Sequence, residues 1–208
     1  EINTYIKQAN ASLSAMGYTE HSFGHVTICA NVVKDILSQL SYSKREINLG
    51  QIAAYMHDIG NVVNRNDHAQ TGAVMAFRIL DNLGMMVEDI ASIVTAIGNH
   101  DDSTAFPVNA ITAALILADK TDVRRSRVTN KDQTNFDIHD RVNYAVIENS
   151  TSLDIEQKTF TLKIIIDTKI CSVMDYFEIF LDRMILCKKA AKKLGLEFKL
   201  IINDLSVI

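Results

Sequence analysis

Two residue types that bind metals stand next to each other at the end of an apolar helical segment, where Asp58 follows His57. Further residues of the same types lie on separate segments on either side, namely His25, His68, His100 and Asp119. A fold that satisfies this pattern must bring five segments to one place. Neutral imidazoles and carboxylates together suit transition metals better than they suit Mg²⁺ or Ca²⁺. We therefore expect the six residues to hold one or two divalent ions of Fe, Mn, Co, Ni or Zn.

Apolar residues recur at steps of three and four through the first 120 residues, a spacing typical of amphipathic helices. The spacing predicts five helices, over residues 22–40, 48–59, 67–83 and 88–99 and, after Pro107, through Ile111, Leu115 and Ala118. We expect Ser22 to cap the first helix and Asn48, with Gln51, to form a capping box for the second. Gly60 and Gly84 are expected to end the second and third helices. Residues 1–128 are thus predicted to form an all-α, metal-binding domain.

The periodicity changes in the last third of the chain. Residues 121–140 are polar without apolar periodicity, and we expect residues 129–140 to connect two domains. Alternation from Thr159 to Ile166 predicts a strand, preceded by shorter strands near residues 142–147 and 153–155. A helix over residues 171–194, ended by Gly195, and a strand over residues 196–202 follow. Residues 141–208 are predicted to form a small α+β domain of order βββαβ, whose sheet edge makes a homodimer a candidate assembly.

Composition narrows the class of protein. A formal net charge of −4 and a pI near 5.9 argue against a broad basic surface for nucleic acid or anionic lipid. The odd number and wide spacing of Cys29, Cys171 and Cys187 favour reduced core thiols over a disulfide framework. The first 18 residues lack the features of an export signal, and no apolar run approaches the roughly 20 residues of a membrane span. These features predict a cytoplasmic protein with no membrane partner.

The order His25, His57-Asp58, Asp119 resembles the H…HD…D signature of the HD-domain metal-dependent phosphohydrolases. The resemblance covers roughly residues 15–128, and its closest segments are Met56-His57-Asp58-Ile59-Gly60 and Ala118-Asp119-Lys120-Thr121-Asp122. It implies a mainly α fold, an HD-domain helical bundle, in which these four residues bind one metal. Many members bind a second metal through histidines from two intervening helices, and His68 and His100 stand where those ligands are expected. Asp58 would then bridge the two ions.

The sequence departs from those members of the family that cleave cyclic dinucleotides. They carry His-His-Glu where this chain has Asn99-His100-Asp101, followed by a Gly-Tyr-Pro motif that is absent here. The resemblance therefore leaves a phosphomonoesterase, a nucleotidase and a dinucleoside polyphosphate hydrolase or other phosphodiesterase open. Some proteins on this scaffold are di-iron oxygenases, so the fold alone does not name the reaction.

These observations favour a metal-dependent phosphohydrolase in which a metal-activated water attacks a nucleotide or other small phosphate ester. Asp58 would act in catalysis, and Lys120 and Arg65 would hold the substrate phosphate. Two alternatives stay open: a regulatory nucleotide- or metal-binding module without turnover, and a di-iron oxygenase. We expect His21 to be a weaker candidate for the site, Asp101 to be a supporting carboxylate or helix cap, and His139 to be a solvated surface residue.

Each of these residues also has a simpler interpretation. His57-Asp58 would serve as a buried ion pair at a helix end, and His68 would cap the backbone of its own helix. The basic cluster of Lys120, Arg124, Arg125 and Arg127 would be a solvated helix face, as most charge runs are.

Overall fold

The computed structural model describes residues 1–207. The α-helices are α1 (Ile2–Ala15), α2 (Phe23–Gln39), α3 (Lys44–Met56), α4 (His68–Asn82), α5 (Val87–Gly98), α6 (Ala110–Lys120), α7 (Ile138–Ala145) and α8 (Val173–Lys193). Short 3₁₀ helices are η1 (Ile59–Val62), η2 (Arg125–Arg127) and η3 (Gln133–Asn135). The strands are β1 (Val146–Asp154), β2 (Thr159–Ile166), β3 (Glu197–Ile202) and β4 (Leu205–Ser206). The predicted fold class, a mainly α protein with a small α+β unit, is confirmed.

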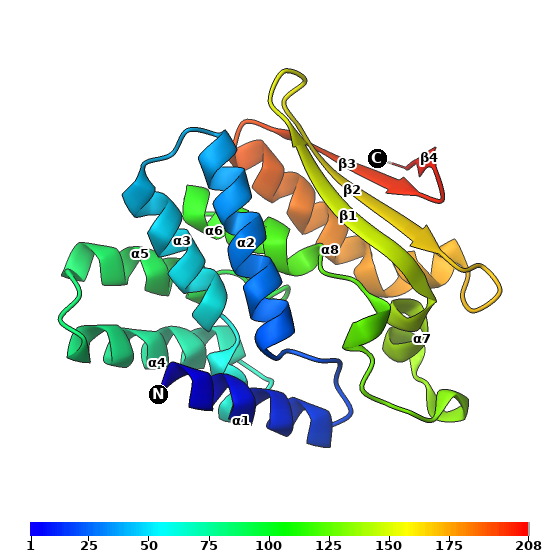
Figure 1. The fold of residues 1–208 in the computed structure, drawn as a ribbon, viewed down its shortest axis with the longest axis horizontal. Helices are drawn as coiled ribbons and strands as arrows, with labels where there is room; N and C mark the ends of the chain where they lie inside the picture. Colours follow the sequence, from blue (N-terminus) through cyan, green and yellow to red (C-terminus); the bar gives the residue numbers. More distant parts are fainter. Residues whose placement is uncertain (208) are drawn as a thin grey trace.

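Helices α1 to α6 form a bundle in which α6 is central (Figure 1). Every residue of α6 from Ile111 to Ala118 is buried, because α2, α3, α5 and α8 all pack against this helix. The predicted helices at α2, α4, α5 and α6 are confirmed. Ser22 caps α2 by accepting a hydrogen bond from the backbone N–H of Gly24, and Gly84 follows α4 with φ of +73°.

Two details of the bundle differ from expectation. The predicted capping box at Asn48 is wrong: α3 begins at Lys44, because Ser43 and Glu46 satisfy each other's backbone N–H groups. Helix α1 was not predicted at all, although it buries Ile6 and Leu13 in the core. Both differences arise in polar segments, where capping and tertiary packing decide the helix bounds more than apolar spacing does.

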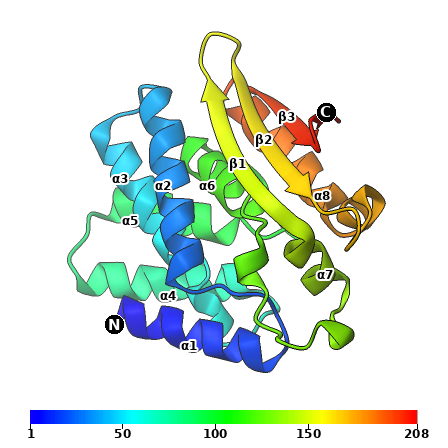
Figure 2. The same cartoon turned by 45° about the vertical axis from the view of Figure 1, so that its right-hand side comes forward.

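The four strands form one sheet in the order β1-β2-β3-β4, and α8 lies between this sheet and α6 (Figures 1 and 2). β1 pairs antiparallel with β2, β2 pairs parallel with β3 through the crossover helix α8, and β4 pairs antiparallel with β3. The predicted strand at β2, the helix at α8 and the strand at β3 are confirmed.

The start of this unit corrects the sequence analysis. Residues 142–145 are not a strand but belong to α7, which begins because Asp137 accepts a hydrogen bond from the backbone N–H of Asp140 at 2.8 Å. Residues 146–154 form the single strand β1 instead of two shorter ones. The order along the chain is therefore ββαββ, where βββαβ was expected.

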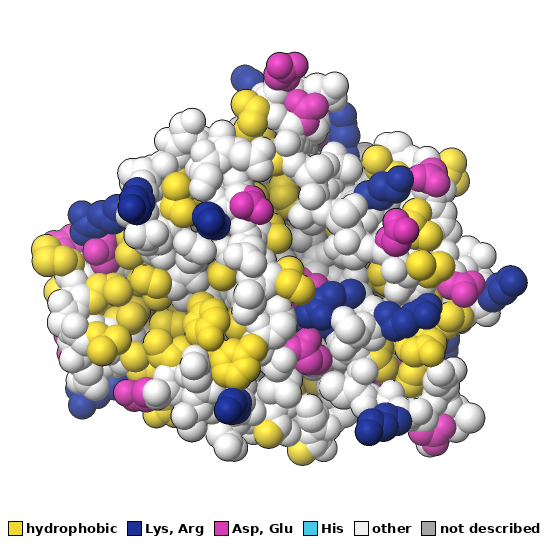
Figure 3. Space-filling view, in the orientation of Figure 1, with side chains coloured by type: hydrophobic (Ala, Val, Ile, Leu, Met, Phe, Trp, Pro, Cys, Tyr) yellow, Lys and Arg dark blue, Asp and Glu magenta, His cyan; other side chains and the backbone are white. Residues whose placement is uncertain are grey.

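A continuous hydrophobic core runs from the helical bundle into the α+β unit. It includes Leu117 of α6, Met184 of α8 and Leu162 of β2, all fully buried. The division into residues 1–128, 129–140 and 141–208 stays a prediction. No helix within residues 1–207 has both the length and the apolar character needed to cross a membrane. Apolar side chains also gather on the bundle surface near α1 and α3, where Ile2, Ile52 and Tyr55 line a shallow groove (Figure 3).

Candidate metal centre

The six residues singled out by the sequence come together at the ends of five helices. His25 lies in the first turn of α2, His57 and Asp58 follow α3, His68 begins α4, His100 follows α5, and Asp119 is the penultimate residue of α6. All of them are buried except Asp119, whose side chain retains 11% of its exposure. Placing these groups at helix ends lets five segments converge without interrupting the packed helix faces.

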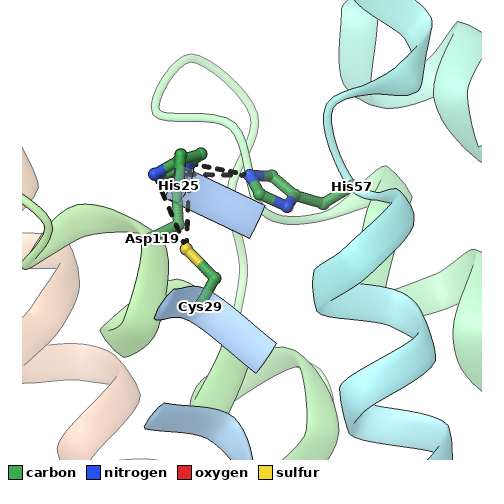
Figure 4. A group of neighbouring side chains, drawn as sticks. All are labelled: His25, Cys29, His57 and Asp119. Carbon is green, nitrogen blue, oxygen red and sulfur yellow. Dashed lines mark hydrogen bonds and ion pairs between the residues drawn. The ribbon is translucent and has the colours of Figure 1, made fainter. Parts of the chain in front are cut away.

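Four of these side chains form the first cluster. The Nε2 atom of His25 lies 3.2 Å from Nε2 of His57 and 3.3 Å from Oδ1 of Asp119. Nε2 of His57 lies 3.2 Å from Oδ2 of Asp58. Figure 4 shows His25, His57 and Asp119 converging. Two nitrogens and two carboxylate oxygens thus meet at one point.

The second cluster lies beside the first. The Nε2 atoms of His68 and His100 are 3.3 Å apart, and Nε2 of His68 is 3.5 Å from Oδ1 of Asp58. Asp58 therefore turns Oδ2 toward the first cluster and Oδ1 toward the second. Asn61 Nδ2 holds this carboxylate by donating to Oδ1 at 2.9 Å. The sequence analysis did not select Asn61. Its side chain contacts Asp58 because the chain turns after α3.

Three of the imidazoles are oriented by backbone carbonyls. Nδ1 of His57 lies 2.7 Å from the Ala54 carbonyl oxygen, and Nδ1 of His100 lies 2.6 Å from that of Ile97. Nδ1 of His68 makes the same contact at 3.0 Å with the residue three positions before it. A carbonyl oxygen only accepts, so each Nδ1 carries the hydrogen. In the neutral ring the Nε2 lone pair then points into the cluster, as in metal-ligating histidines.

His25 is oriented differently, by the carboxylate of Asp122. Its Nδ1 lies 2.7 Å from Asp122 Oδ2, and Arg124 Nε donates to Oδ1 of the same carboxylate at 2.7 Å. Arg127, which is also buried, donates to the Asp122 backbone carbonyl. Asp122 was missed as a site residue, although it lies only three residues after Asp119, just past the end of α6. Arg127 and Arg124 are accordingly not part of a solvated helix face.

The protonation of the imidazoles differs between the two clusters. Burial lowers the pKa of His57, but the carboxylates of Asp58 and Asp119 outweigh burial and raise this pKa to about 10. Burial lowers the pKa of His68, and it lowers the pKa of His100 to about 3. At neutral pH His57 is thus protonated and carries a positive charge beside the two carboxylates. The second pair is neutral, and its two lone pairs face each other.

The residues present fit a bound cation on two counts. Oδ2 of Asp58 is buried and accepts no well-directed hydrogen bond among the described residues, and its nearest polar neighbours are the Nε2 atoms of His57 at 3.2 Å and His25 at 3.6 Å. Two neutral Nε2 atoms at 3.3 Å, each with its hydrogen on Nδ1, repel each other, and the Arg65 guanidinium offsets this repulsion only through a long contact of 3.5 Å with His68. Burial would raise the pKa of Asp58 and Asp119, yet His57 and Lys120 respectively help to hold both well below the usual range. Both carboxylates are therefore ionised and available to bind metal.

Cys29 lies next to the first cluster. Its Sγ is 3.7 Å from Nε2 of His25, one turn earlier on α2, and burial raises the pKa of the thiol well above its usual value (Figure 4). The sequence analysis placed Cys29 in the core, and the structure adds that it borders the candidate centre. Cys171 and Cys187 are buried free thiols as well.

A cavity of about 380 Å³ opens onto both clusters. Asp58, His68, His100 and Asp119 line it, together with four basic side chains, namely Arg65, Lys120, Arg127 and Arg183. The two basic residues proposed from the sequence, Lys120 and Arg65, thus reach the cavity. Nζ of Lys120 is 2.6 Å from Asp119 Oδ2, and Nη1 of Arg65 is 3.5 Å from Nε2 of His68.

Two of the weaker candidates, His21 and His139, lie at the rim of the same cavity. His21 lines it, and its ring contacts that of His25 edge-on with centroids 5.5 Å apart. His139, expected on the surface, is exposed and also borders the cavity. Oδ1 of Asp101 is 3.8 Å from His68 Nε2, and its other oxygen accepts a hydrogen bond from Ser103. Asp101 therefore supports the local loop more than it approaches the clusters.

Comparison with known proteins adds two findings. A family model described as HD domain matches residues 18–179, a range that contains all six clustered residues. The chain is also 25% identical to the uncharacterized protein MJ1020 of Methanocaldococcus jannaschii, with 81% of this chain and 73% of that protein covered.

Proposed function

The chain belongs to the HD domain family, and on that premise we propose that it is a metal-dependent phosphohydrolase acting on a nucleotide or another small phosphate ester. The observation that carries this proposal is the position of Asp58, whose two carboxylate oxygens face two separate imidazole pairs. A carboxylate in that position suits two ions that share one ligand.

We propose the following ligand sets. His25, His57, Asp58 and Asp119 would hold the first ion. His68, His100 and the second oxygen of Asp58 would hold the other. The mixed nitrogen and oxygen donors suit Fe, Mn, Co, Ni or Zn. When bound, the ions would lower the pKa of a coordinated water toward neutrality and stabilise the negative charge of a phosphoryl group.

Two basic side chains, Lys120 and Arg65, would bind the phosphate ester through their positive charges. Lys120 sits between the Asp119 and Asp102 carboxylates, which raise the pKa of its ammonium group against the effect of burial and keep it positive. Arg65 would bring a second positive charge from the side of the second cluster. Together the two side chains would orient a phosphate over the centre.

The size of the cavity supports a small substrate. About 380 Å³ is at the lower end of the range for small-molecule pockets, so a single nucleotide or a sugar-sized ester fits better than a polymer. A phosphomonoesterase, a nucleotidase and a phosphodiesterase for a compact substrate are the forms of the activity that this supports.

The proposal is tested by phosphate release from a panel of nucleotides and p-nitrophenyl phosphate, with Mn²⁺, Co²⁺ or Fe²⁺ added. We expect turnover by the wild-type chain, and loss of both turnover and bound metal in Asp58→Ala. Asp81→Ala, which removes an exposed carboxylate from α4, is the matched control and should retain both. Metal binding with neither phosphate release nor cleavage of a phosphodiester such as bis(p-nitrophenyl) phosphate would favour the regulatory module, and consumption of oxygen by the iron form would favour the oxygenase.

A further inference from the structure

Arg183 was not selected from the sequence, and it lies beyond residue 179, where the family match ends. It belongs to α8, the crossover helix of the α+β unit, which packs against α6 (Figure 1). Because of this packing, Arg183 lines the same cavity as Asp119 and Lys120. The second unit of the fold thus contributes a charged side chain to the candidate site.

Two contacts fix the guanidinium group of Arg183. Its Nε donates to Oδ2 of Asp102 at 2.8 Å, and its Cζ lies 4.7 Å from the centroid of the Phe180 ring. The other oxygen of Asp102 lies 3.2 Å from Nζ of Lys120. One carboxylate therefore holds Arg183 and Lys120 side by side, and the side chain of Arg183 keeps 26% of its exposure.

The donors of Arg183 are largely unused. Neither of its terminal Nη atoms has a hydrogen-bond or ion-pair partner in the part of the chain that the structure describes. A guanidinium offers five N–H groups in a planar fork that matches two oxygens of a phosphate. The side chain is held at Nε and by the aromatic ring, while its outer edge stays available for a ligand.

The other basic side chains of the cavity are more heavily engaged. Two carboxylates pair with Lys120. Arg127 is buried and donates from Nε and Nη1 to the backbone carbonyls of Glu20 and Asp122. The hydrogen-bond contacts of Arg65 are long, at 3.4 and 3.5 Å, and its Cζ lies 5.8 Å from the centroid of the Tyr18 ring. This residue lies on the side of the second cluster. On the side of Asp119, Arg183 is thus the basic residue whose guanidinium is held in place while its Nη donors are free to bind a ligand.

We propose that Arg183 binds the phosphate group of the substrate, with Asp102 and Phe180 as the residues that position its guanidinium. This inference rests on the proposed function. It makes the part of α8 that lies beyond residue 179, where the family match ends, part of the substrate site.

The test uses inorganic phosphate as the probe and the full chain loaded with Mn²⁺. Calorimetry gives the phosphate Kd for wild type, Arg183→Ala and Arg183→Lys. Arg45→Ala is the matched control, because Nε of Arg45 makes the same 2.8 Å bond to an aspartate, Asp89, but on the surface and away from the cavity. We expect Arg183→Ala to raise the Kd about tenfold to a hundredfold, the loss of a charge-assisted bidentate contact. The phosphate Kd of Arg183→Lys should fall between those of wild type and Arg183→Ala, and the Kd of Arg45→Ala should match that of wild type.

Measuring ester hydrolysis beside phosphate binding distinguishes a failure of this inference from a failure of the proposed phosphohydrolase function. For any ester that the chain hydrolyses, Arg183→Ala should raise KM more than it lowers kcat. Phosphate binding that depends on Arg183 in a chain that hydrolyses no ester would refute the phosphohydrolase and uphold the anion site. Wild-type affinity in Arg183→Ala, or no phosphate binding by the wild type, would overturn the inference. Circular dichroism verifies that the variants fold, and Arg183→Gln replaces Arg183→Ala if the latter does not.

Discussion

At the scale of single residues, the acceptor that orients each imidazole sets how strongly that imidazole binds a cation. His57, His68 and His100 donate from Nδ1 to neutral carbonyl groups, whereas His25 faces the carboxylate of Asp122. A carboxylate acceptor makes the ring a stronger electron donor and fixes its orientation. The metal affinity of the first cluster therefore depends on the carboxylate of Asp122, which is not itself one of the proposed metal ligands.

The substitution Asp122→Asn tests this dependence. It removes the negative charge beside His25 while preserving the size of the side chain, so we expect metal affinity of the first cluster to fall about 10- to 100-fold. Titration of the metal-depleted chain with Co²⁺, followed by its absorption spectrum, measures the change. Asp132→Asn, at an exposed position, serves as the control and should leave the titration unaltered. Equal affinity in Asp122→Asn and wild type would show that Asp122 does not support His25.

The pKa of His57 predicts a coupling between metal and protons. In the metal-free chain this pKa is about 10, so His57 is protonated at pH 7 and must lose its proton to bind a metal. His68 and His100 have lowered pKa values and are already neutral. We expect release of about one proton per chain, and apparent affinity that rises about tenfold for each unit of pH between 7 and 9. Calorimetry in two buffers of different ionisation enthalpy measures the release, and a binding enthalpy independent of the buffer would contradict it.

At this scale the sequence could predict residues whose role is visible in their type and spacing, but not residues whose role depends on contacts between distant segments. The types and spacing of His25, His57, Asp58, His68, His100 and Asp119 were enough to expect one centre, and the structure brings the six together. Asp122 and Arg183 were missed because their roles come from contacts between elements far apart in sequence. Arg183 is 81 residues from Asp102, and no local pattern links them.

At the scale of secondary-structure elements, the close approach of η1 to α4 positions Asp58 opposite His68. Gly60 permits this approach. A Cβ atom on Gly60 would overlap the His68 carbonyl oxygen and would lie within 2.5 Å of the Gly72 backbone nitrogen. Gly60 had been expected only to end a helix, and its actual role is to leave room for a neighbouring backbone.

We expect Gly60→Ala to lower the free energy of unfolding by about 3 kcal/mol or more, because backbone atoms cannot move aside as side-chain ends do. Gly98→Ala is the matched control, since a Cβ there meets only the Ala73 side chain at 3.6 Å, an ordinary contact. That control should change the free energy of unfolding by less than about 1 kcal/mol. Urea unfolding measures both variants, and similar stabilities would refute the steric role of Gly60.

The elements themselves were predictable where apolar spacing is strong. This holds for α2, α4, α5, α6, β2, α8 and β3. It failed for α1, which has no side-chain cap, and for the start of α3 and for α7, where side-chain caps set the bounds. Asp137 starts α7 in a segment whose composition resembles a loop, and Val142 and Ala145, which suggested a strand, face the core from a helix.

At the scale of the whole molecule, the α+β unit and the helical bundle share one hydrophobic core and are not separate packing units. α8 packs on α6, which is buried from Ile111 to Ala118 (Figure 2). Helix α8 also carries Arg183, which lines the cavity. The sequence indicated two parts with different periodicity, but it contained no signal for how they meet. The parts therefore share one core and, on our proposal, one substrate site.

The central claim is that this molecule holds two metal ions with Asp58 between them. Element-resolved metal analysis of the chain, purified without chelator and re-equilibrated with Mn²⁺ or Fe²⁺, tests it most directly. We predict about two ions per chain in the wild type, and a marked loss in Asp58→Ala. A wild-type chain that takes up no more than one ion, or an Asp58→Ala chain that keeps the full complement, would contradict the account.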